Sequence, residues 1–166
     1  LDFGDYMSLI ILDSGHTQSI EGPQAKWLEK TLSEKINTLH KFAAYHVPAY
    51  PSVRKFDAKV STKIRKTWVP LFEAGKLNAV FEHHDHAYKR TFPLLQGEIN
   101  QEDGIIYLGD GAFGVKEARV PKDLTGKWYL EKAIPTRHFI LVTLKGKIRI
   151  YQAINEKGQL IDSVSK

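Results

Sequence analysis

The sequence of 166 residues predicts an α/β fold that ends in an antiparallel β segment. In the first 90 residues, short runs rich in β-branched and leucine side chains alternate with stretches of helical periodicity. This alternation favours parallel strands joined by right-handed crossovers. In residues 91–166, expected strands follow one another and glycine turns separate them. We therefore expect a single unit, with 1–90 carrying the strand and helix alternation and 91–166 forming the antiparallel C-terminal segment.

The first half of the chain shows three apolar runs with a helical stretch after each of the first two. The expected strands are 7–13, 42–45 and 78–82, and the expected helices are 23–37 and 57–72. In the first helical stretch Trp27, Leu28, Leu32 and Ile36 recur at helical spacing and would face the sheet. Pro23 stands near the start of this stretch, where a helix tolerates proline.

The second half contains five short runs typical of strands. These runs are 92–98, 104–109, 137–144, 147–153 and 159–164. The stretch RHFILVTLKGKIRIYQAI favours a β-hairpin that turns at Lys145 and Gly146, and a similar turn occurs at Lys157 and Gly158. These patterns predict antiparallel pairing in the C-terminal part.

The composition excludes several classes of protein. The chain has no cysteine, which removes disulfides, thiolate metal ligands and a cysteine nucleophile. No apolar run approaches the roughly 18 residues of a membrane-spanning helix. Lysines are spread along the chain instead of forming a block that would bind nucleic acid. We therefore expect neither a membrane nor a nucleic-acid partner, and the net charge of +5 would help to attract anionic substrates.

Four of the seven histidines stand directly after expected strands. His46 follows the second strand, and His83, His84 and His86 follow the third. In an open α/β sheet, functional groups gather beyond the carboxyl ends of the strands, so His46 and the later cluster would converge. Alternate residues of an extended segment point to the same side, so His84 and His86 would share a face. Three neutral imidazoles that meet in this way predict a metal site.

The other histidines and the neighbouring carboxylates carry less of the argument. His83 is expected to be exposed. The remaining histidines, His16, His40 and His138, are expected to have only surface or packing roles. Carboxylates such as Glu82 and Asp85 are usually solvated, and we do not expect them to bind metal.

Several motifs together resemble those of calcineurin-like metallophosphoesterases, in particular the purple acid phosphatases. FEHHDHAYKR is similar to the last metal-binding motif of these enzymes, commonly written G-H-x-H-a-Y-e-R, and YHVPAYPS is similar to the motif before it. FGDYMSLIILDSG followed by PQAKWLEKTL resembles their core strand and Q-x-x-W-L-x-x-x-L helix. GIIYLGDGAFG and NEKGQLIDS resemble their C-terminal segment. The resemblance covers nearly the whole chain and implies the C-terminal half of a β-sandwich flanked by helices, with the C-terminal segment attached.

The resemblance implies roles for individual residues. His46 and His84 match ligands of the second, divalent metal, and His86 matches a ligand of the first metal, which is ferric iron in purple acid phosphatases. Tyr88 and Arg90 match residues that usually support the site without binding metal. The cofactors implied for the complete enzyme are two metal ions, iron with zinc, manganese or a second iron.

Two departures from the family pattern matter. His83 stands where the family has a glycine, a residue that permits an unusual backbone angle or a close approach. The family's earlier motifs, of the D-x-G, G-D-x-x-Y and G-N-H-[DE] kinds, have no counterpart here, so the bridging aspartate and the asparagine ligand are missing. The chain also opens on a strand pattern with no signal peptide, which predicts that upstream sequence has been lost. We therefore expect a fragment that binds at most one metal ion weakly and is inactive alone.

The function implied for the complete protein is hydrolysis of a phosphate ester by a dinuclear metal centre that activates water. Its expected partners are a phosphate-ester substrate and the missing N-terminal half of the domain. Loss of that half would expose a sheet edge and apolar surface, which a homodimer of the fragment would cover. Relatives are often exported, which suggests a secreted or periplasmic protein.

Two alternatives stay open at this point. One is a non-catalytic metal-binding or interaction module, in which the histidines bind stray metal or none. The other is a phosphodiesterase or nucleotidase of the same fold. The loops that would select the leaving group, 49–57 and 115–135, show no recognisable code.

Overall fold

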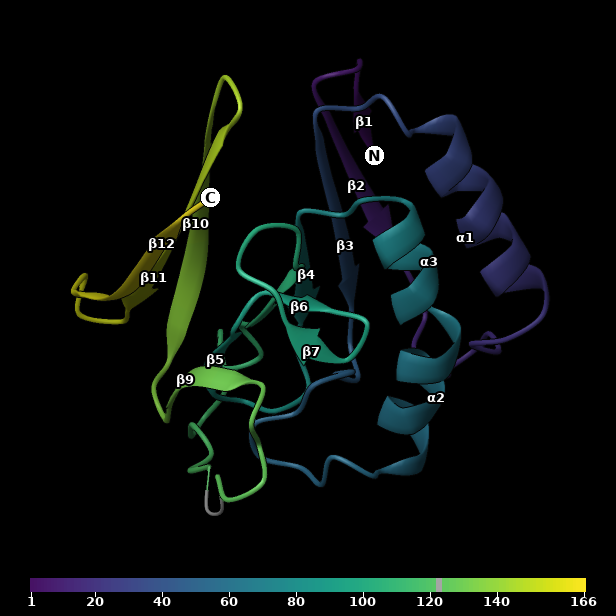
Figure 1. Cartoon of the computed structure of the whole chain (residues 1–166). Coiled ribbons are helices and arrows are strands. Elements are labelled where there is room, and N and C mark those ends of the chain that lie inside the picture. Colours follow the sequence, from purple (N-terminus) through teal and green to yellow (C-terminus); the bar gives the residue numbers. More distant parts are fainter. Residues whose placement is uncertain (122–123) are drawn as a thin grey trace.

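The computed structural model describes residues 1–121 and 124–166 and arranges them in three layers. Those residues form three helices, a seven-stranded sheet and a three-stranded sheet. The helices lie on one face of the large sheet and the small sheet lies on the other (Figure 1). The large sheet has the order β1-β2-β3-β4-β8-β5-β9, the small sheet the order β10-β11-β12, and β6 pairs with β7. The strands are β1 Asp2–Phe3, β2 Met7–Ile11, β3 His40–Tyr45, β4 Ala79–Glu82, β5 Tyr88–Thr91, β6 Leu94–Leu95, β7 Glu98–Ile99, β8 Ile106–Gly109, β9 Leu130–Ile134, β10 His138–Lys145, β11 Ile148–Asn155 and β12 Leu160–Ser165. The predicted α/β fold class with antiparallel C-terminal strands is confirmed.

Four neighbouring strands of the large sheet run parallel, as the alternation of strands and helices predicted. β2 pairs with β3, β3 with β4, and β4 with β8. Because β8 lies beyond residue 90, the expectation of a wholly antiparallel segment over 91–166 is wrong for this strand. The reason is that β5 runs antiparallel to β8 and returns the chain to the edge where the parallel strands begin.

The helices are α1 Pro23–Glu34, α2 Lys59–Thr67 and α3 Val69–Ala74. We predicted one helix over 57–72, and the structure divides it at Trp68. Pro70 explains the division, because proline has no N–H to donate and its ring clashes with the carbonyl four residues earlier. Trp68 is fully buried, and its indole N–H donates to the carbonyl oxygen of Ile20 at 2.8 Å. No helix in the described ranges is long and apolar enough to cross a bilayer.

Three strands of the large sheet, β1, β5 and β9, were not predicted. β5 ends at Thr91, and the expected strand at 92–98 is replaced by the short hairpin of β6 and β7. Pro93 interrupts this stretch, because proline cannot donate to a strand ladder. β9 has the sequence LEKAI, which lacks the alternation that marks a strand. The three predicted C-terminal strands correspond to β10, β11 and β12, which pair antiparallel.

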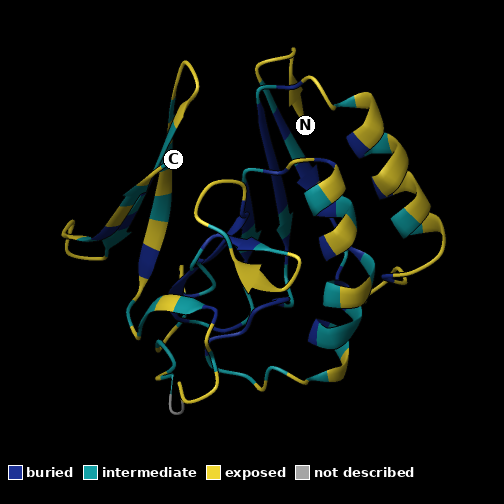
Figure 2. Cartoon of the chain, viewed as in Figure 1, coloured by how far each residue is buried: buried dark blue, intermediate teal, exposed yellow. Residues whose placement is uncertain are grey.

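Two hydrophobic cores fill the spaces between the layers. The first lies between the helices and the large sheet and includes Leu28, Trp68 and Tyr107. The second lies between the two sheets and includes Leu108 and Tyr151. Figure 2 shows that the central strands are buried while the outer face of α1 is exposed. The ends of the central strands are therefore firm supports for the loops that follow them.

Buried polar contacts tie the small sheet to the large one. Asp162 on β12 accepts hydrogen bonds from the hydroxyl of Tyr88 at 2.6 Å and from Nε of Arg90 at 2.7 Å, and Arg90 also pairs with Glu131. Burial by itself would raise the pKa of Asp162, but hydrogen bonds from Arg90, Tyr88 and Lys132 outweigh it and lower the pKa to about 2. The resemblance implied that Tyr88 and Arg90 support the metal ligands. In the structure, the hydroxyl of Tyr88 and the guanidinium of Arg90 point toward the small sheet, and Arg90 also reaches β9.

Candidate metal centre

His46 and the later histidine cluster lie side by side at the carboxyl ends of β3 and β4. Tyr45, the last residue of β3, is paired with Glu82, the last residue of β4, so the two loops leave the sheet at the same level. The backbone N–H groups of His83 and His84 both donate to the carbonyl oxygen of His46, at 3.1 and 2.9 Å. The two loops are thus fixed to each other through the backbone.

The rings of His46 and His84 face each other. Nε2 of His46 lies 2.7 Å from Nδ1 of His84, and the ring centroids are 4.6 Å apart. Two nitrogens that bind one ion at about 2.1 Å are about 3.0 Å apart when the ligands stand at right angles, and about 3.4 Å apart in a tetrahedron. The observed separation is close to the first value. The pair therefore fits two ligands of one ion after a small outward movement of the rings.

His86 lies in a turn and not in the extended segment that we predicted. Residues 84–87 turn and bend, and His86 has a positive φ of 51°. The expectation that His84 and His86 share a face by alternation is therefore wrong, because a turn has no such alternation. His86 lines a cavity of about 510 Å³ together with His46 and His83. Within residues 1–121 and 124–166, however, no three His, Asp or Glu side chains already converge as a set of metal ligands.

The histidine rings are held in the neutral form that metal binding needs. Burial, helped by the positive charge of Arg54, lowers the pKa of His84 to about 4. Burial also lowers the pKa of His46, and burial together with the charge of Arg119 lowers the pKa of His86. A neutral imidazole keeps a lone pair for a metal ion, so protons compete little with a metal at pH 7.

A buried ion pair crosses the sheet beneath the histidines. Glu82 on β4 and Lys89 on β5 pair with each other, with side chains no more than 1% exposed, although β8 lies between their strands. Gly109 is the β8 residue paired with both of them. A Cβ at Gly109 would lie 2.5 Å from Cγ of Lys89, so the glycine leaves the space through which the lysine reaches the glutamate. The ammonium group of Lys89 also donates to the carbonyl oxygen of Tyr50.

Glu82 also holds the loop that carries His46. Its Oε1 accepts hydrogen bonds from the hydroxyl of Tyr45 and from the backbone N–H of Ala49, both at 2.7 Å. Tyr45 and Ala49 stand on either side of His46, so the carboxylate fixes both ends of this short segment. The expectation that Glu82 is solvated is therefore wrong, because a residue at the end of a buried strand points beneath the loops.

Asp85 is likewise buried, with 4% of its surface exposed, and not a solvated carboxylate. Its Oδ2 accepts hydrogen bonds from the backbone N–H groups of Ser52 at 2.6 Å and Val53 at 2.9 Å. Its Oδ1 is buried and makes no hydrogen bond to any residue that the structure describes. Asp85 therefore pins the loop that follows His46.

His83 is not the freely exposed side chain that we expected. Its Nδ1 is hydrogen-bonded to Oδ1 of Asp110, and both residues line the cavity beside His46. His83 replaces the glycine of the family pattern without a positive φ. The close approach occurs at Gly111 instead, where a Cβ would lie 1.4 Å from the carbonyl oxygen of His83. The residue that must be small is therefore Gly111, which follows β8 and lies against the backbone of His83.

Sequence reasoning also missed His16, which lies against the histidine pair. Its ring packs edge-to-face on that of His46, with centroids 5.2 Å apart. Asp13 determines this position, because its carboxylate accepts hydrogen bonds from the backbone N–H groups of residues 15–18, at 2.7 to 3.1 Å. The available signal was an aspartate and a glycine turn directly after a buried strand, at the same edge of the sheet as His46.

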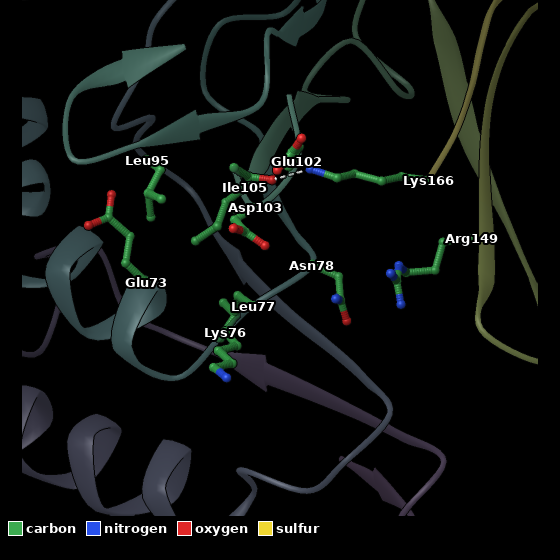
Figure 3. A pocket seen from close by; sticks show the side chains of 11 residues that line it. Glu73, Lys76, Leu77, Asn78, Leu95, Glu102, Asp103, Ile105, Arg149 and Lys166 are labelled. Atoms are coloured by element: carbon green, nitrogen blue, oxygen red, sulfur yellow. Dashed lines mark hydrogen bonds between the residues drawn. The ribbon is translucent and has the colours of Figure 1, made fainter. Parts of the chain in front are cut away.

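A second cavity, of about 450 Å³, lies at the opposite edge of the sheet (Figure 3). It is lined by residues that precede β4 and β8, such as Asn78 and Gly104, and by Arg149 and Lys166 from the C-terminal part. Lys166 donates to the carbonyl oxygen of Gly104 at 2.6 Å. The histidine site lies at the carboxyl ends of the parallel strands, where ligands bind in this class of fold. This cavity lies at the other ends of the strands and is therefore a separate site.

No family model matches the chain, and no curated protein matches its sequence. Several solved structures resemble it in fold, among them the following two. The purple acid phosphatase PPD1 from yellow lupin (Lupinus luteus) seeds has a TM-score of 0.83 at 18% sequence identity, over 99% of this chain and 31% of that chain. GAP50, the anchor in the inner membrane complex of Plasmodium, has a TM-score of 0.71 at 12% identity, over 95% of this chain and 48% of that chain.

The chain therefore spans about a third of the phosphatase and about half of GAP50. The likeness establishes the fold, which is similar to the C-terminal portion of a purple acid phosphatase, and confirms the fold predicted from the motifs. One neighbour is a phosphatase and the other is described as an anchor. The shared fold is thus compatible with hydrolysis and with a binding role, and the choice depends on the residues of the site.

Proposed function

We propose, from the fold it shares with a purple acid phosphatase, that this chain supplies histidine ligands to a dinuclear metal centre that hydrolyses phosphate esters. The observation that carries the proposal is the 2.7 Å separation of the ring nitrogens of His46 and His84, beyond the ends of two parallel strands. These two residues would bind the divalent ion, and His86 would bind the iron. The metal ions, when bound, neutralise phosphate oxygens and lower the pKa of a bound water molecule.

The protein's own part in this function is to hold the ligands ready. Glu82 fixes both ends of the segment around His46, and Asp85 pins the loop that follows it. Such contacts to the surroundings of a ligand keep its ring in one orientation, so less order must be created when an ion binds. The cavity of about 510 Å³ beside His46 leaves space for a phosphate ester.

The donor set of this chain is incomplete for two metals. Oδ2 of Asp85 accepts from loop amides, which turns this carboxylate toward the preceding loop, and Oδ1 of Asp110 is hydrogen-bonded to Nδ1 of His83. A carboxylate that bridges two ions would therefore come from protein outside this sequence. We accordingly propose that the 166-residue chain binds one ion and has little or no hydrolytic activity by itself.

Zinc binding to the 166-residue chain tests the proposal directly. Isothermal titration calorimetry is expected to give one zinc ion per chain. His46→Ala and His84→Ala should each weaken binding at least tenfold, because each removes one of two facing ligands. His40→Gln is the control, because His40 is a buried histidine at the opposite edge of the sheet, where its Nε2 contacts the carbonyl oxygen of Gly146. Equal binding by His84→Ala and the unmodified chain would contradict the proposal.

A non-catalytic role is the second candidate, and the likeness to GAP50, described as an anchor, is the observation that favours it. A longer protein that includes the upstream sequence separates the two functions. The enzyme proposal expects two metal ions per chain by elemental analysis and turnover of a p-nitrophenyl monoester or diester. A longer protein that binds no metal would favour the anchor role, and the relative rates on the two esters would identify a phosphomonoesterase or a phosphodiesterase.

A further inference from the structure

Two cationic side chains meet at the cavity of Figure 3, and in the described part of the chain both have neutral hydrogen-bond acceptors. Arg149 on β11 and Lys166, directly after β12, line this cavity and extend into it from the same side. Nη1 of Arg149 donates to Nδ1 of His40 at 3.1 Å, and Nζ of Lys166 donates to a backbone carbonyl oxygen at 2.6 Å. His40 is neutral, because burial lowers its pKa and its other ring nitrogen donates to the carbonyl oxygen of Gly146. Neither acceptor therefore neutralises its cation.

Two buried polar groups on β11 lack a hydrogen-bond partner among the residues that the structure describes. They are Nε of Arg149 and the hydroxyl of Tyr151. The two residues are two positions apart on a strand, so their side chains point to the same face. Burial raises the pKa of Tyr151 and the charge of Arg149 lowers it, so the two groups lie close together. Buried groups without a partner are rare in proteins and indicate that a water molecule or a ligand belongs beside them.

Arg90 shows how an arginine of this chain binds a carboxylate. Its Nε and Nη2 donate to the two oxygens of Asp162, at 2.7 and 3.4 Å. Arg149 uses Nη1 for His40, and within the described ranges its Nε and Nη2 have no acceptor. The paired N–H donors of a guanidinium group match the spacing of two carboxylate oxygens. The acceptor that fits the unused edge of Arg149 is therefore a carboxylate.

Acidic side chains line the same cavity. Glu102 and Asp103 are both exposed there, and Glu73 and Lys76 add one charge of each sign. Burial and the neighbouring arginine lower the pKa of Lys166, and the negative charge of Asp103 opposes them. A ligand with only a negative charge would be attracted by the cations and repelled by the acids. A ligand that carries one charge of each sign complements both groups.

We propose that this cavity binds a free α-amino acid with an apolar side chain. The carboxylate of the ligand accepts hydrogen bonds from Arg149 and Lys166, and its ammonium group lies beside Glu102 and Asp103. The cavity volume of about 450 Å³ is within the usual range for small-molecule sites. The apolar side chain of the ligand packs against the three apolar residues of the lining, which are Leu77, Leu95 and Ile105. The site is independent of the proposed metal centre, which lies at the opposite edge of the sheet.

Calorimetric titration of the 166-residue chain with three matched probes tests the ligand class. The probes are L-leucine, isocaproate, which lacks the amino group, and isoamylamine, which lacks the carboxylate. We expect L-leucine to bind at one site and isoamylamine to bind roughly tenfold more weakly, because it cannot accept from the guanidinium group. Isocaproate should bind about threefold to fivefold more weakly, because exposed carboxylates attract an ammonium group less strongly. Isocaproate that binds as tightly as L-leucine would overturn the amino-acid assignment.

Substitutions on the two sides of the cavity test the site itself. Arg149→Met should weaken L-leucine binding roughly tenfold, because it removes hydrogen bonds between charged groups. Arg149→Lys keeps the charge but loses the paired donors, so an intermediate affinity is expected. Asp103→Asn should weaken L-leucine binding about threefold and leave isocaproate binding unchanged. Asp103 is exposed, so this variant decides the question even if Arg149→Met does not fold.

Arg137→Met is the matched control, because Arg137 is paired with Glu156 and does not line this cavity. It should leave the affinity for L-leucine unchanged. The proposal is overturned if L-leucine does not bind up to its solubility limit, which is the result expected when a buried water molecule satisfies Arg149 and Tyr151. It is also overturned if the folded Arg149→Met variant binds L-leucine as the unmodified chain does, or if Arg137→Met weakens binding equally.

Discussion

The buried pair of Glu82 and Lys89 should be needed for stability and for the position of His46. Glu82→Gln keeps the shape of the side chain and an oxygen that can accept from Tyr45 and Ala49. It removes the negative charge, however, and leaves the ammonium group of Lys89 buried without a counter-charge. Because both side chains are no more than 1% exposed, we expect the free energy of unfolding to fall by about 3–5 kcal/mol, the range for a buried pair that loses one partner.

The double variant Glu82→Gln with Lys89→Met separates the charge effect from the loss of contacts. Replacing both members of a buried ion pair by uncharged groups of similar shape is often neutral. The double variant should therefore recover most of the loss and lie within about 2 kcal/mol of the unmodified chain. The two substitutions would then be strongly non-additive, as is typical of side chains in contact.

Urea denaturation followed by tryptophan fluorescence measures these differences, because Trp68 is fully buried. A zinc titration of each folded variant then tests the link to the histidines. We expect Glu82→Gln to weaken zinc binding about tenfold and the double variant to restore part of it. A loss below about 1 kcal/mol for Glu82→Gln would refute the energetic reasoning, given the range above. Unchanged zinc affinity in the folded variant would refute the claim that the pair positions His46.

Two further predictions concern Gly111 and Asp162. Gly111→Ala would place a Cβ 1.4 Å from the carbonyl oxygen of His83. In urea denaturation it should lower the free energy of unfolding by about 4 kcal/mol or more, and in calorimetric titrations it should weaken zinc binding. Gly114→Ala is the control, because an added Cβ there meets no neighbour and only the positive φ of 70° opposes it, which costs about 1–2 kcal/mol of stability. Equal losses of stability in the two variants would contradict a clash at Gly111. The folded-state pKa of Asp162, about 2, lies below the ordinary value of 3.8, so its stabilising contribution is complete above pH about 4 and is lost as the pH falls toward 2. Urea denaturation at pH 2 to 6 should therefore show that acid lowers the free energy of unfolding less in Asp162→Asn than in the unmodified chain. If this free energy depends on pH in the same way in both proteins, the low pKa assigned to Asp162 is contradicted.

The sequence was sufficient to predict the strands that position the site, because their apolar runs and the helical spacing between them are local patterns. His46 and His84 were predicted as candidates from their places after two strands, since parallel strands end at one edge of a sheet. The division of the helix at Trp68 was also readable, because Pro70 stands inside the expected range, two residues before its end.

The surroundings of the histidines could not be predicted, because they depend on contacts between distant segments. Nothing in the local pattern shows that Glu82 reaches Lys89 past Gly109, since this requires β8 to lie between β4 and β5. The burial of Asp85 likewise depends on a loop more than 30 residues earlier in the chain. The turn at His86 was missed because a positive φ is uncommon for any residue other than glycine.

The insertion of β8 between β4 and β5 has a consequence for the order of folding. The histidine turn joins β4 to β5, and these strands become part of one sheet only when β8, later in the sequence, pairs with both of them. Pairing that depends on chain segments far apart forms slowly, because loop closure must come first. The turn can therefore adopt its final shape only late in folding, and the capacity to bind an ion would appear after most of the hydrophobic core has formed.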